Sequence, residues 1–553
     1  MPTELPLVID NLSFRYHTRS DLALKNINLS VKAGEMLLIA GASGCGKTTL
    51  ARCINGLIPR SYKGELNGSI RMHGKDIRSL SLARISQIVG TVLQDPERQI
   101  LGTRVRSEVA FGLENLGWTR EDILRTVDEA LERLNISHLR DRETFNLSGG
   151  EKQKVALAGV LAMKPSILLL DEPLASLDPA SAWETLDAVR SLADEGMSVL
   201  MVEHRVEDVL RIRPDRVLFM QEGQIRYLGD LDGLEEAVNY REVKLAAPAI
   251  MRRAAKDPRP RAITPHLARM DTAHEPAEPL VRFENVAFGY DTDRQVLQGI
   301  NLDIRRGDII AVLGPNGTGK TTLVKHAIGL LKPKAGRVLV NGHDTHELSV
   351  AQIANTLGYV FQSPSHMLFA PTVYDELAFG PTNLHHDSDL IRAEVNEAIR
   401  IVNLVGFEDK PPLALSFGQQ KRVSIAAILA MRSRILVMDE PTAGQDYKNY
   451  MDFMDSIIQL PSFEAILFIT HDIDMAVIYA NRVLLVNNGT VVKDGKPAEV
   501  LQDMDLLRQC RLVPTSLLKT NLEYYAQTGK FMRAEELAYV VPPVVRETDS
   551  IHG

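Results

Sequence analysis

The feature that most constrains this sequence is an internal repeat. Four motifs occur twice in the same order: "GASGCGKTT" (41–49) and "GPNGTGKTT" (314–322), "VLQDP" (92–96) and "VFQSP" (360–364), "ILLLDEP" (167–173) and "ILVMDEP" (435–441), and "VEHRVEDV" (202–209) and "ITHDIDMA" (469–476). Paired positions are separated by 320 − 47 = 273, 362 − 94 = 268, 440 − 172 = 268 and 471 − 204 = 267 residues. Because the offsets are nearly equal, we infer that the chain contains a duplicated domain.

The repeat predicts four parts. They are a first domain at 5–240, a linker or extension at 241–279, a second domain at 280–505 and a C-terminal helical extension at 506–553. The linker contains many prolines and charges and little apolar periodicity. In the C-terminal part, "LLKTNLEYYAQ" and "AEELAYVV" have a spacing that predicts short amphipathic helices. These helices would either cap their own domain or contact the other copy.

Composition restricts the compartment and the partners. With 553 residues, 45% apolar and 24% charged, the chain resembles a globular protein of several domains. A net charge of −8 argues against nucleic acid as the main partner. Three cysteines cannot form a disulfide framework, and no signal peptide or long apolar span is evident. We therefore expect a cytoplasmic protein that reaches a membrane only through partners.

Each glycine-rich motif lies between an apolar run, "EMLLIA" (35–40) or "DIIAVL" (308–313), and a plausible helix. Glycines let backbone N–H groups converge on phosphates, and the helix N-terminus adds positive potential. In such a loop the lysine reaches the β- and γ-phosphates and the next hydroxyl holds Mg²⁺. The sequence therefore predicts two ATP-binding loops with these residues: Gly41, Ser43, Gly44, Gly46, Lys47, Thr48 and Thr49, and Gly314, Asn316, Gly317, Gly319, Lys320, Thr321 and Thr322.

Each loop is followed by an apolar run that ends in two carboxylates, as expected for a buried parallel strand. Open α/β sheets bind ligands at the carboxyl ends of their strands. Asp171 and Asp439 would then face Mg²⁺, and Glu172 and Glu440 would polarise the water that attacks the γ-phosphate. One Asp-Glu pair could simply cap a helix, but two pairs at matching distances from two phosphate loops favour the catalytic interpretation.

"LSGGE" (147–151) and "LSFGQ" (415–419) narrow the class. Each is followed by a basic helix and then by the Asp-Glu strand, so the chain resembles ATP-binding cassette (ABC) ATPases over about 5–235 and 280–505. The resemblance implies an α/β fold of two tandem P-loop nucleotide-binding domains. Each would have a RecA-like core, an antiparallel β subdomain and a helical subdomain that carries the signature.

The same resemblance implies roles for further residues. Tyr16 and Tyr290 look like the aromatic residues that stack on adenine, although either could be an ordinary strand aromatic. Gln94 and Gln362 resemble the glutamines that sense Mg²⁺ and the attacking water. His204 and His471 resemble the histidines that contact the γ-phosphate.

In ABC ATPases the two domains close head to tail, so that each ATP lies between the phosphate loop of one and the signature of the other. The signature residues that would contact ATP are Ser148, Gly150, Ser416 and Gly418. The second signature has Phe417 where the first has Gly149. Phenylalanine is acceptable there only if the backbone φ is negative. We expect Phe417 to make the two sites unequal without silencing one.

"LFAPTVYDELAFGPTNL" (368–384) and "EVAFGLENLG" (108–117) resemble the ATPases of energy-coupling factor (ECF) importers for vitamins and cobalt or nickel ions, as does the stretch from "LVPTSLLKTNL" (512–522). This resemblance implies a transmembrane partner, a small substrate-binding membrane subunit and a place on the cytoplasmic face of the membrane. The segments 95–117 and 363–384, with Phe111 and Phe379, would dock on the transmembrane partner.

Two other functions remain open from the sequence. One is the fused ATPase of a sugar importer, which would share the chemistry but not the ECF-like segments. The other is a soluble tandem ABC protein acting on ribosomes. That class usually has a long basic helical linker, whereas the linker here is short and broken by prolines. The transported substrate would contact another polypeptide, so this chain does not reveal it.

Overall fold

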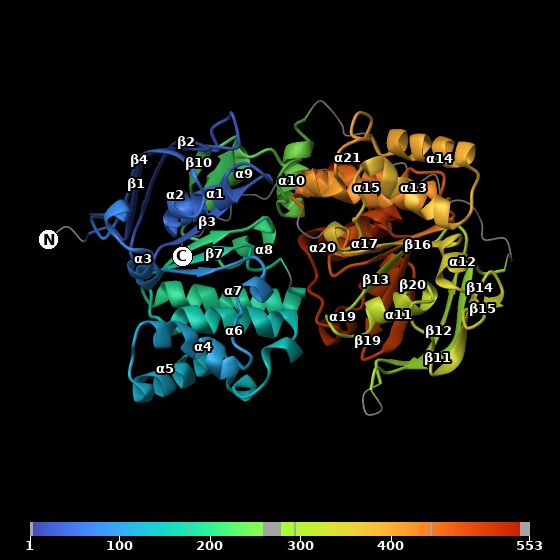
Figure 1. The fold of residues 1–553 in the computed structure, drawn as a ribbon, viewed down its shortest axis with the longest axis horizontal. Coiled ribbons are helices and arrows are strands. Elements are labelled where there is room, and N and C mark those ends of the chain that lie inside the picture. Colours follow the sequence, from blue (N-terminus) through green and yellow to red (C-terminus); the bar gives the residue numbers. More distant parts are fainter. Residues whose placement is uncertain (1–3, 176, 258–277, 292–294, 443–444, 542–553) are drawn as a thin grey trace. The chain divides into compact units, whose positions relative to one another are not determined.

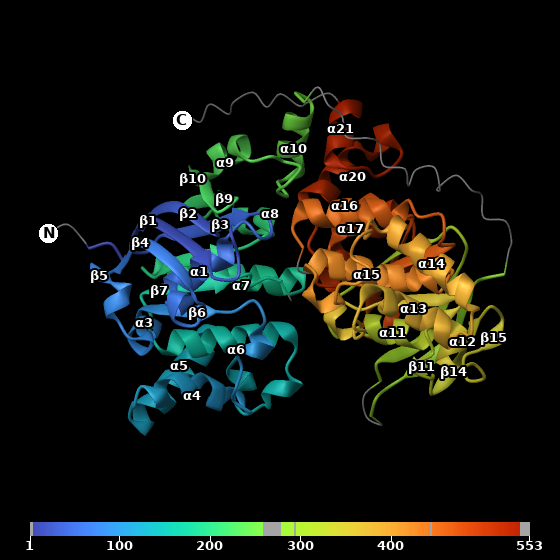
Figure 2. The ribbon, with the colours of Figure 1, turned by 45° about the horizontal axis from the view of Figure 1, so that its top comes forward.

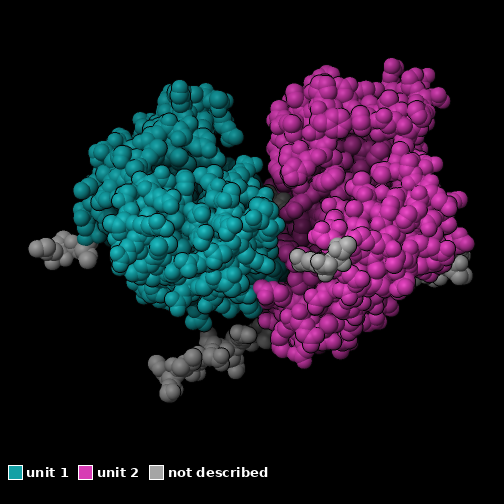
Figure 3. Space-filling model, turned by 60° about the horizontal axis from the view of Figure 1, so that its bottom comes forward, with its two compact units in different colours: residues 1–245, 446–448 teal, residues 246–445, 449–553 magenta. Residues whose placement is uncertain are grey.

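The computed structural model describes residues 4–175, 177–257, 278–291, 295–442 and 445–541. The chain divides into two compact units, Met1–Leu245 with Asp446–Lys448 and Ala246–Gln445 with Asn449–Gly553 (Figure 3). Each unit contains one copy of the repeat. The two units have the same two kinds of sheet, in the same strand order.

Each unit contains a four-stranded antiparallel sheet (Figure 1). In the first unit the order β2-β1-β4-β5 is made by β1 (Leu7–Tyr16), β2 (Leu24–Val31), β4 (Gly64–Met72) and β5 (Lys75–Asp76). In the second unit the order β12-β11-β14-β15 is made by β11 (Val281–Phe288), β12 (Leu297–Ile304), β14 (Ala335–Val340) and β15 (His343–Asp344). Alternate residues of β2 are buried, as a sheet covered on one face requires.

The six-stranded sheet is the core of each unit. The first has the order β10-β9-β3-β8-β7-β6: β3 (Met36–Gly41), β6 (Val89–Val92), β7 (Ile167–Asp171), β8 (Ser198–Val202), β9 (Arg216–Gln221) and β10 (Gln224–Gly229). The second has the order β16-β17-β18-β13-β19-β20: β13 (Ile309–Leu313), β16 (Leu357–Val360), β17 (Ile435–Asp439), β18 (Ala465–Ile469), β19 (Arg482–Asn487) and β20 (Thr490–Gly495). Only β10 and β20 run antiparallel to their neighbours. Every residue of β3, β8, β13 and β18 is buried, which explains their uninterrupted apolar sequences.

The helices follow the same repeat. In the first unit they are α1 (Lys47–Ile54), α2 (Leu57–Arg60), α3 (Leu82–Ile88), α4 (Val105–Asn115), α5 (Arg120–Arg133), α6 (Gly149–Ala162), α7 (Pro179–Asp194), α8 (Val206–Leu210) and α9 (Leu231–Ala237). In the second they are α10 (Ala247–Ala254), α11 (Lys320–Ala327), α12 (Val350–Ala354), α13 (Val373–Asn383), α14 (Ser388–Ile401), α15 (Phe417–Ala430), α16 (Tyr447–Ile458), α17 (Ile473–Tyr479), α18 (Pro497–Leu501), α19 (Met504–Gln509), α20 (Ser516–Thr528) and α21 (Ala534–Val540). None of the described helices has both the length and the apolarity needed to cross a bilayer.

Helices α4, α5 and α6 pack together as a helical subdomain, and α13, α14 and α15 do so in the second unit. The predicted α/β fold of two tandem P-loop domains, each with a parallel core, an antiparallel β subdomain and a helical subdomain, is therefore confirmed.

The C-terminal extension packs on its own domain. Both helices predicted there are present, as α20 and α21. The buried Arg533 side chain donates to Asp455 of α16 (3.1 Å) and to the hydroxyl of Tyr479 of α17 (3.0 Å). Residues 542–553 lie outside the described chain.

Part of the stretch predicted as a linker is a helix. Helix α10 packs against α20 and α21 (Figure 2), where the Ala247 N–H donates to Ser516 Oγ at 2.8 Å. Its buried Ala247, Ile250, Met251 and Ala254 have the spacing of one helical face, a pattern too short to stand out in the sequence. The prediction for 258–277 concerns residues that the structure does not describe.

Candidate functional site

The two phosphate loops have the same geometry. Each connects a buried strand, β3 or β13, to the first residue of a helix, which is Lys47 or Lys320. Gly41 has a φ of 150°, and a Cβ there would lie only 2.3 Å from the carbonyl oxygen of Met220. Gly314 has the same φ, so both positions require glycine. Each loop thus joins a buried strand to a helix N-terminus, which is the setting of an anion-binding loop.

The loop lysines are buried and point back into their own loops. Lys47 Nζ donates to the carbonyl oxygens of Gly41 and Ala42, both at 2.8 Å. Lys320 Nζ donates in the same way to Gly314 and Pro315, both at 2.7 Å. Each ammonium is therefore held where a phosphate bound to the loop would meet it.

In the first unit, the carboxylates after β7 meet residues from two other segments. Glu172 Oε1 lies 2.7 Å from His204 Nε2, and Gln94 Nε2 donates to Glu172 Oε2 at 2.6 Å. Glu172 has a φ of 50°, a backbone region that non-glycine residues seldom adopt. Three residues that the sequence placed at one site are thus brought together.

The pKa values of the two neighbouring carboxylates, Asp171 and Glu172, are shifted in opposite directions. Burial and the charge of Glu172 raise the pKa of Asp171 to about 6. Burial also raises the pKa of Glu172, but the hydrogen bond and charge of His204 outweigh it, so the net shift is downward. Asp171 Oδ1 is buried without a hydrogen-bond partner among the described residues. A buried carboxylate oxygen of this kind suits a cation ligand.

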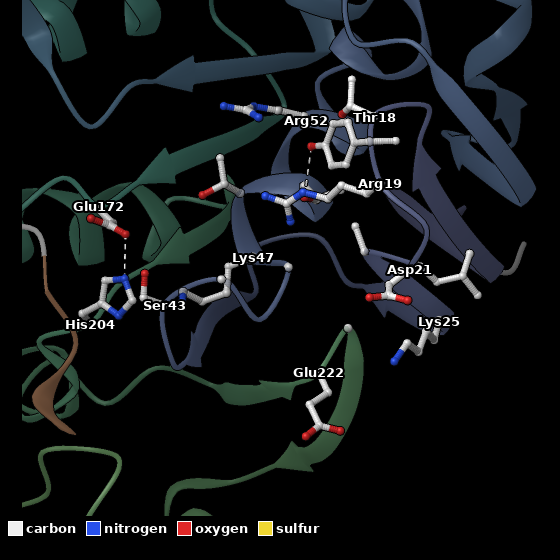
Figure 4. A pocket seen from close by; sticks show the side chains of 18 residues that line it. Thr18, Arg19, Asp21, Lys25, Ser43, Lys47, Arg52, Glu172, His204 and Glu222 are labelled. Carbon is white, nitrogen blue, oxygen red and sulfur yellow. Dashed lines mark hydrogen bonds and ion pairs between the residues drawn. The ribbon is translucent and has the colours of Figure 1, made fainter. Parts of the chain in front are cut away.

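A cavity of about 600 Å³ opens in front of these groups in the first unit (Figure 4). Its wall includes Lys47, Arg52, Glu172 and His204. Tyr16 also lines it; its hydroxyl lies 3.1 Å from Thr49 Oγ1, and its ring packs edge-on against Phe14. Ser43, Gly44, Gly46 and Thr48 complete the loop side. The size and the mixture of basic, hydroxyl and aromatic groups fit a nucleotide.

The second unit holds its carboxylates differently. Asp439 Oδ2 accepts from Thr321 Oγ1 and from the hydroxyl of Tyr359, each at 2.9 Å. Burial raises the pKa of Asp439, and burial with the Asp439 charge raises that of Tyr359. Tyr359 was not predicted from the sequence; its position two residues before the loop containing Gln362 is the only clue.

Glu440 is paired with the predicted histidine. Its Oε1 lies 2.9 Å from His471 Nδ1, and Thr470 Oγ1 donates to its Oε2 at 3.4 Å. Glu440 repeats the positive φ of its counterpart, at 45°. Gln362 is exposed, and within the described chain no hydrogen bond joins it to Glu440, unlike Gln94 in the first unit. Tyr290 repeats the arrangement of Tyr16, with its hydroxyl 3.4 Å from Thr322 Oγ1.

The signature serines begin the helices of the two helical subdomains. Ser148 caps α6 and Ser416 caps α15, and each forms a capping box with the residue three positions later. Phe417 is the first residue of α15 and is not among the residues with positive φ; neither are Gly149, Gly150 and Gly418. The backbone at this position therefore accepts a side chain without strain.

Lys421, four residues after Phe417, was also missed. It is buried, donates to the carbonyl oxygen of Pro441 at 2.5 Å, and lies 5.2 Å from the centre of the Phe417 ring. Burial lowers its pKa to about 7, although the Glu440 charge opposes this. No feature of the local sequence shows that this lysine is inside, because lysine is rarely buried.

Comparison with known proteins identifies the class. The family model described as "ABC transporter" matches residues 24–175 and 297–443. A protein of Lactiplantibacillus plantarum assigned as an ABC transporter ATP-binding protein is 36% identical, covering 96% of this chain and 98% of its own length. One of Caldanaerobacter subterraneus with the same assignment is 35% identical, covering 96% and 98%.

Among solved structures, cbiO1 from Clostridium perfringens, described as part of the ABC transporter complex cbiONQ, matches 42% of this chain and 94% of its own. It has 34% identity and a TM-score of 0.39.

Proposed function

The chain belongs to the family of ABC transporter ATP-binding proteins, and on this premise we propose that it energises an importer of the ECF type. Members of this family hydrolyse ATP, generally with Mg²⁺, and work with membrane permease subunits. The chain is therefore an ATPase and the ATP-binding subunit of an ABC transporter. The proposal adds the importer type, the roles of the site residues, the coupling surface and a place at the cytoplasmic face of the membrane.

The first part of the proposal concerns the hydrolytic residues. Lys47 and Lys320 bind the phosphates, and Glu172 and Glu440 orient and deprotonate the attacking water. The support is the observed pairing of each glutamate with His204 or His471 at hydrogen-bond distance. A carboxylate of lowered pKa stays ionised near neutral pH and can accept a proton.

The residues present fit Mg²⁺. Thr48 with Asp171 and Thr321 with Asp439 supply the hydroxyl and carboxylate oxygens that Mg²⁺ prefers, and Gln94 and Gln362 would complete each set. The unpartnered Oδ1 of Asp171 supports this assignment in the first unit. Bound Mg²⁺ would neutralise charge on the phosphate oxygens.

The observation that carries the importer proposal is an exposed apolar surface on each helical subdomain. In the first unit it contains Leu101 and Phe111, which are 69% and 45% exposed. In the second it contains Phe369 and Phe379, which are 63% and 52% exposed and stack edge-on at 4.8 Å. Exposed apolar patches indicate binding surfaces. Both surfaces lie in the segments that resemble ECF ATPases, so a transmembrane subunit is the proposed partner.

The two copies are proposed to close head to tail over ATP, as in the family. The signature of one copy would then supply its serine to the ATP held by the other. Fusion in one chain raises the effective concentration of the second domain. The substrate-binding membrane subunit belongs to the same proposal, and the transported molecule would be recognised there.

Copurification from detergent-solubilised membranes tests the proposal. The tagged chain should copurify with a transmembrane protein and a small membrane subunit, and Phe111→Glu with Phe379→Glu should abolish this while ATP hydrolysis persists. Arg120→Glu, an exposed position at the start of α5, is the matched surface control. Retention of the membrane proteins by the double variant would contradict the coupling surface. Copurification with ribosomes, or with a sugar-binding importer, would contradict the ECF assignment.

A further inference from the structure

The residue before the site histidine differs between the copies. It is Glu203 in the first unit and Thr470 in the second, and both are buried. The residue after the histidine also differs, being Arg205 in the first unit and Asp472 in the second. In the first site, His204 is therefore preceded by a buried acidic residue, Glu203, and followed by a basic residue, Arg205.

Glu203 connects two loops of the first site. Its Oε1 accepts from the backbone N–H groups of His204 (2.8 Å) and Arg205 (3.1 Å). Its Oε2 accepts from the N–H of Leu174, two residues after Glu172, at 3.3 Å. One carboxylate thus joins the histidine loop to the segment that leaves the catalytic strand.

Arg205 holds the same segment from its other side. Its guanidinium donates to the carbonyl oxygen of Leu174 at 3.2 Å and to that of Leu177 at 3.5 Å. The N–H and the carbonyl of Leu174 are therefore both bound by residues that flank His204. Asp208 accepts from Arg205 Nε at 2.6 Å, which fixes the guanidinium.

Among the described residues, the second unit repeats only the bond to the residue after the histidine, and Thr470 makes no hydrogen bond to the segment after Glu440. Thr470 Oγ1 donates to Glu440 and accepts from the N–H of Asp472 at 3.1 Å. Its short side chain bonds to the glutamate itself rather than to the segment beyond it. Glu203 places a carboxyl group beside Glu172, whereas Thr470 places a hydroxyl group beside Glu440.

We propose that Glu203 is a positioning residue for ATP hydrolysis at the first site, where its carboxylate locks the His204 loop to the segment after Glu172. The inference rests on the proposed roles of Glu172 and His204. The lock fixes the distance between those two residues and makes the first site differ from the second.

The charged and titratable groups around Glu203 are Glu172 at the end of β7, and His204 and Arg205 on its own loop. Burial and the Glu172 charge raise the pKa of Glu203, opposed mainly by the Arg205 N–H. The positioning role therefore rests on the three hydrogen bonds that Glu203 accepts.

The test measures kcat and KM for MgATP in the full chain carrying Glu440→Gln, so that hydrolysis reports the first site. Glu203→Thr, the second copy's residue, should lower kcat roughly 10-fold with KM within about twofold, because alignment and not binding is lost. Glu203→Gln keeps the side-chain shape and one acceptor oxygen, so it should lower kcat less than Glu203→Thr does. Glu65→Gln, an exposed carboxylate on β4, is the control that should change neither.

If Glu440→Gln alone abolishes hydrolysis, the two sites act together. The Glu203 variants are then measured in the otherwise wild-type chain, where the same fall in kcat is expected. An unchanged kcat in both Glu203 variants would overturn the inference. The inference would also be overturned if Glu203→Gln lowered kcat only because a matching fraction of the protein had unfolded at the assay temperature. Glu172→Gln, measured in parallel in the otherwise wild-type chain, separates the two proposals: if it retains full activity, the catalytic assignment fails, whatever Glu203 does.

Discussion

The first and second sites are built on the same backbone but hold their acids differently. In the first, Glu172 is bound by His204 and Gln94, and one oxygen of Asp171 has no partner among the described residues. In the second, both Asp439 and Glu440 have hydroxyl donors. Duplication therefore preserved the positions of the proposed catalytic groups, while their neighbours changed.

One strand position shows how this happens. Thr91 of β6 pairs with Leu169 of β7, and Tyr359 of β16 pairs with Val437 of β17, so the two occupy the same place in their sheets. Only the longer tyrosine carries a hydroxyl to the acid at the end of the adjacent strand. A single substitution beside an unchanged carboxylate therefore changes its hydrogen bonds and its pKa.

The largest effect is expected from the paired glutamates. Glu172→Gln with Glu440→Gln should reduce ATP hydrolysis about 10²- to 10⁴-fold, because a positioned proton acceptor is lost from each site. Nucleotide binding should persist, at close to two MgATP per chain by equilibrium dialysis. Near-normal phosphate release by the double variant would refute the assignment, and a clear stoichiometry of one would show that the sites are not equivalent binders.

Substitution of the two signature serines, Ser148 and Ser416, compares the two sites directly. Ser416→Ala and Ser148→Ala should each lower the ATPase rate about 10-fold or more with membrane partners present, because a donor to the γ-phosphate is lost. Each change also removes a helix cap, which costs about 1 kcal/mol. Ser416→Asp and Ser148→Asp retain a capping side chain without the hydroxyl and separate the two effects. If Ser416→Ala changes nothing while Ser148→Ala is severely impaired, the site served by the Phe417 signature is already silent.

Tyr359→Phe removes a bond that only the second site has. The free energy of local unfolding around β17 should fall by about 1–2 kcal/mol, since a hydrogen bond to a buried carboxylate is lost. Hydrogen exchange of peptides covering 435–439 measures this. The matched change in the first unit, Thr91→Val, should leave the exchange of 167–171 nearly unchanged, and equal effects in both units would show that the tyrosine contact is not the cause.

His326 and Cys53 occupy matching positions, six residues after the loop lysines Lys320 and Lys47. We therefore expect the stability of the two units to respond differently to acid. Burial lowers the pKa of His326, whereas it raises the pKa of Cys53 to about 12. Below about pH 6.5 the unfolded histidine binds a proton that the folded one resists, so the second unit loses stability as pH falls.

His326→Cys should remove this loss of stability in acid, measured by urea unfolding followed by circular dichroism at about pH 7.5 and 5.5. The reciprocal Cys53→His should introduce it in the first unit. Both tryptophans, Trp118 and Trp183, lie in that unit, so their fluorescence reports it separately. Equal acid sensitivity of the wild-type chain and His326→Cys would contradict the prediction.

The smallest effect is expected from Phe417→Gly. Because position 417 does not have a positive φ, glycine relieves no strain, and the ATPase rate should change less than about threefold. A much larger gain would mean that Phe417 obstructs the site, and the steady-state rate with membrane partners decides between the two outcomes.

The sequence alone determined the duplication, both phosphate loops, the strands that end in Asp-Glu and the two C-terminal helices. These features depend on short-range patterns: glycine spacing, uninterrupted apolar runs and helical periodicity. A loop that follows a buried strand and begins a helix has little conformational choice. The family resemblance of the sequence pointed to Phe111 and Phe379 as docking residues. Their exposure comes from the structure, and the docking role stays a prediction.

Only the tertiary structure decided which other side chains from distant parts of the chain meet, beyond the glutamine and histidines that the motifs predicted. Tyr359 meets Asp439 across 80 residues, Glu203 meets Leu174 across 29, and Arg533 reaches Asp455 across 78. None of these pairs belongs to a short sequence motif, so the spacing of residues along the chain does not reveal the contacts. Packing brings the residues together, and burial then gives their charges and hydrogen bonds an energy that the same groups would lack in water.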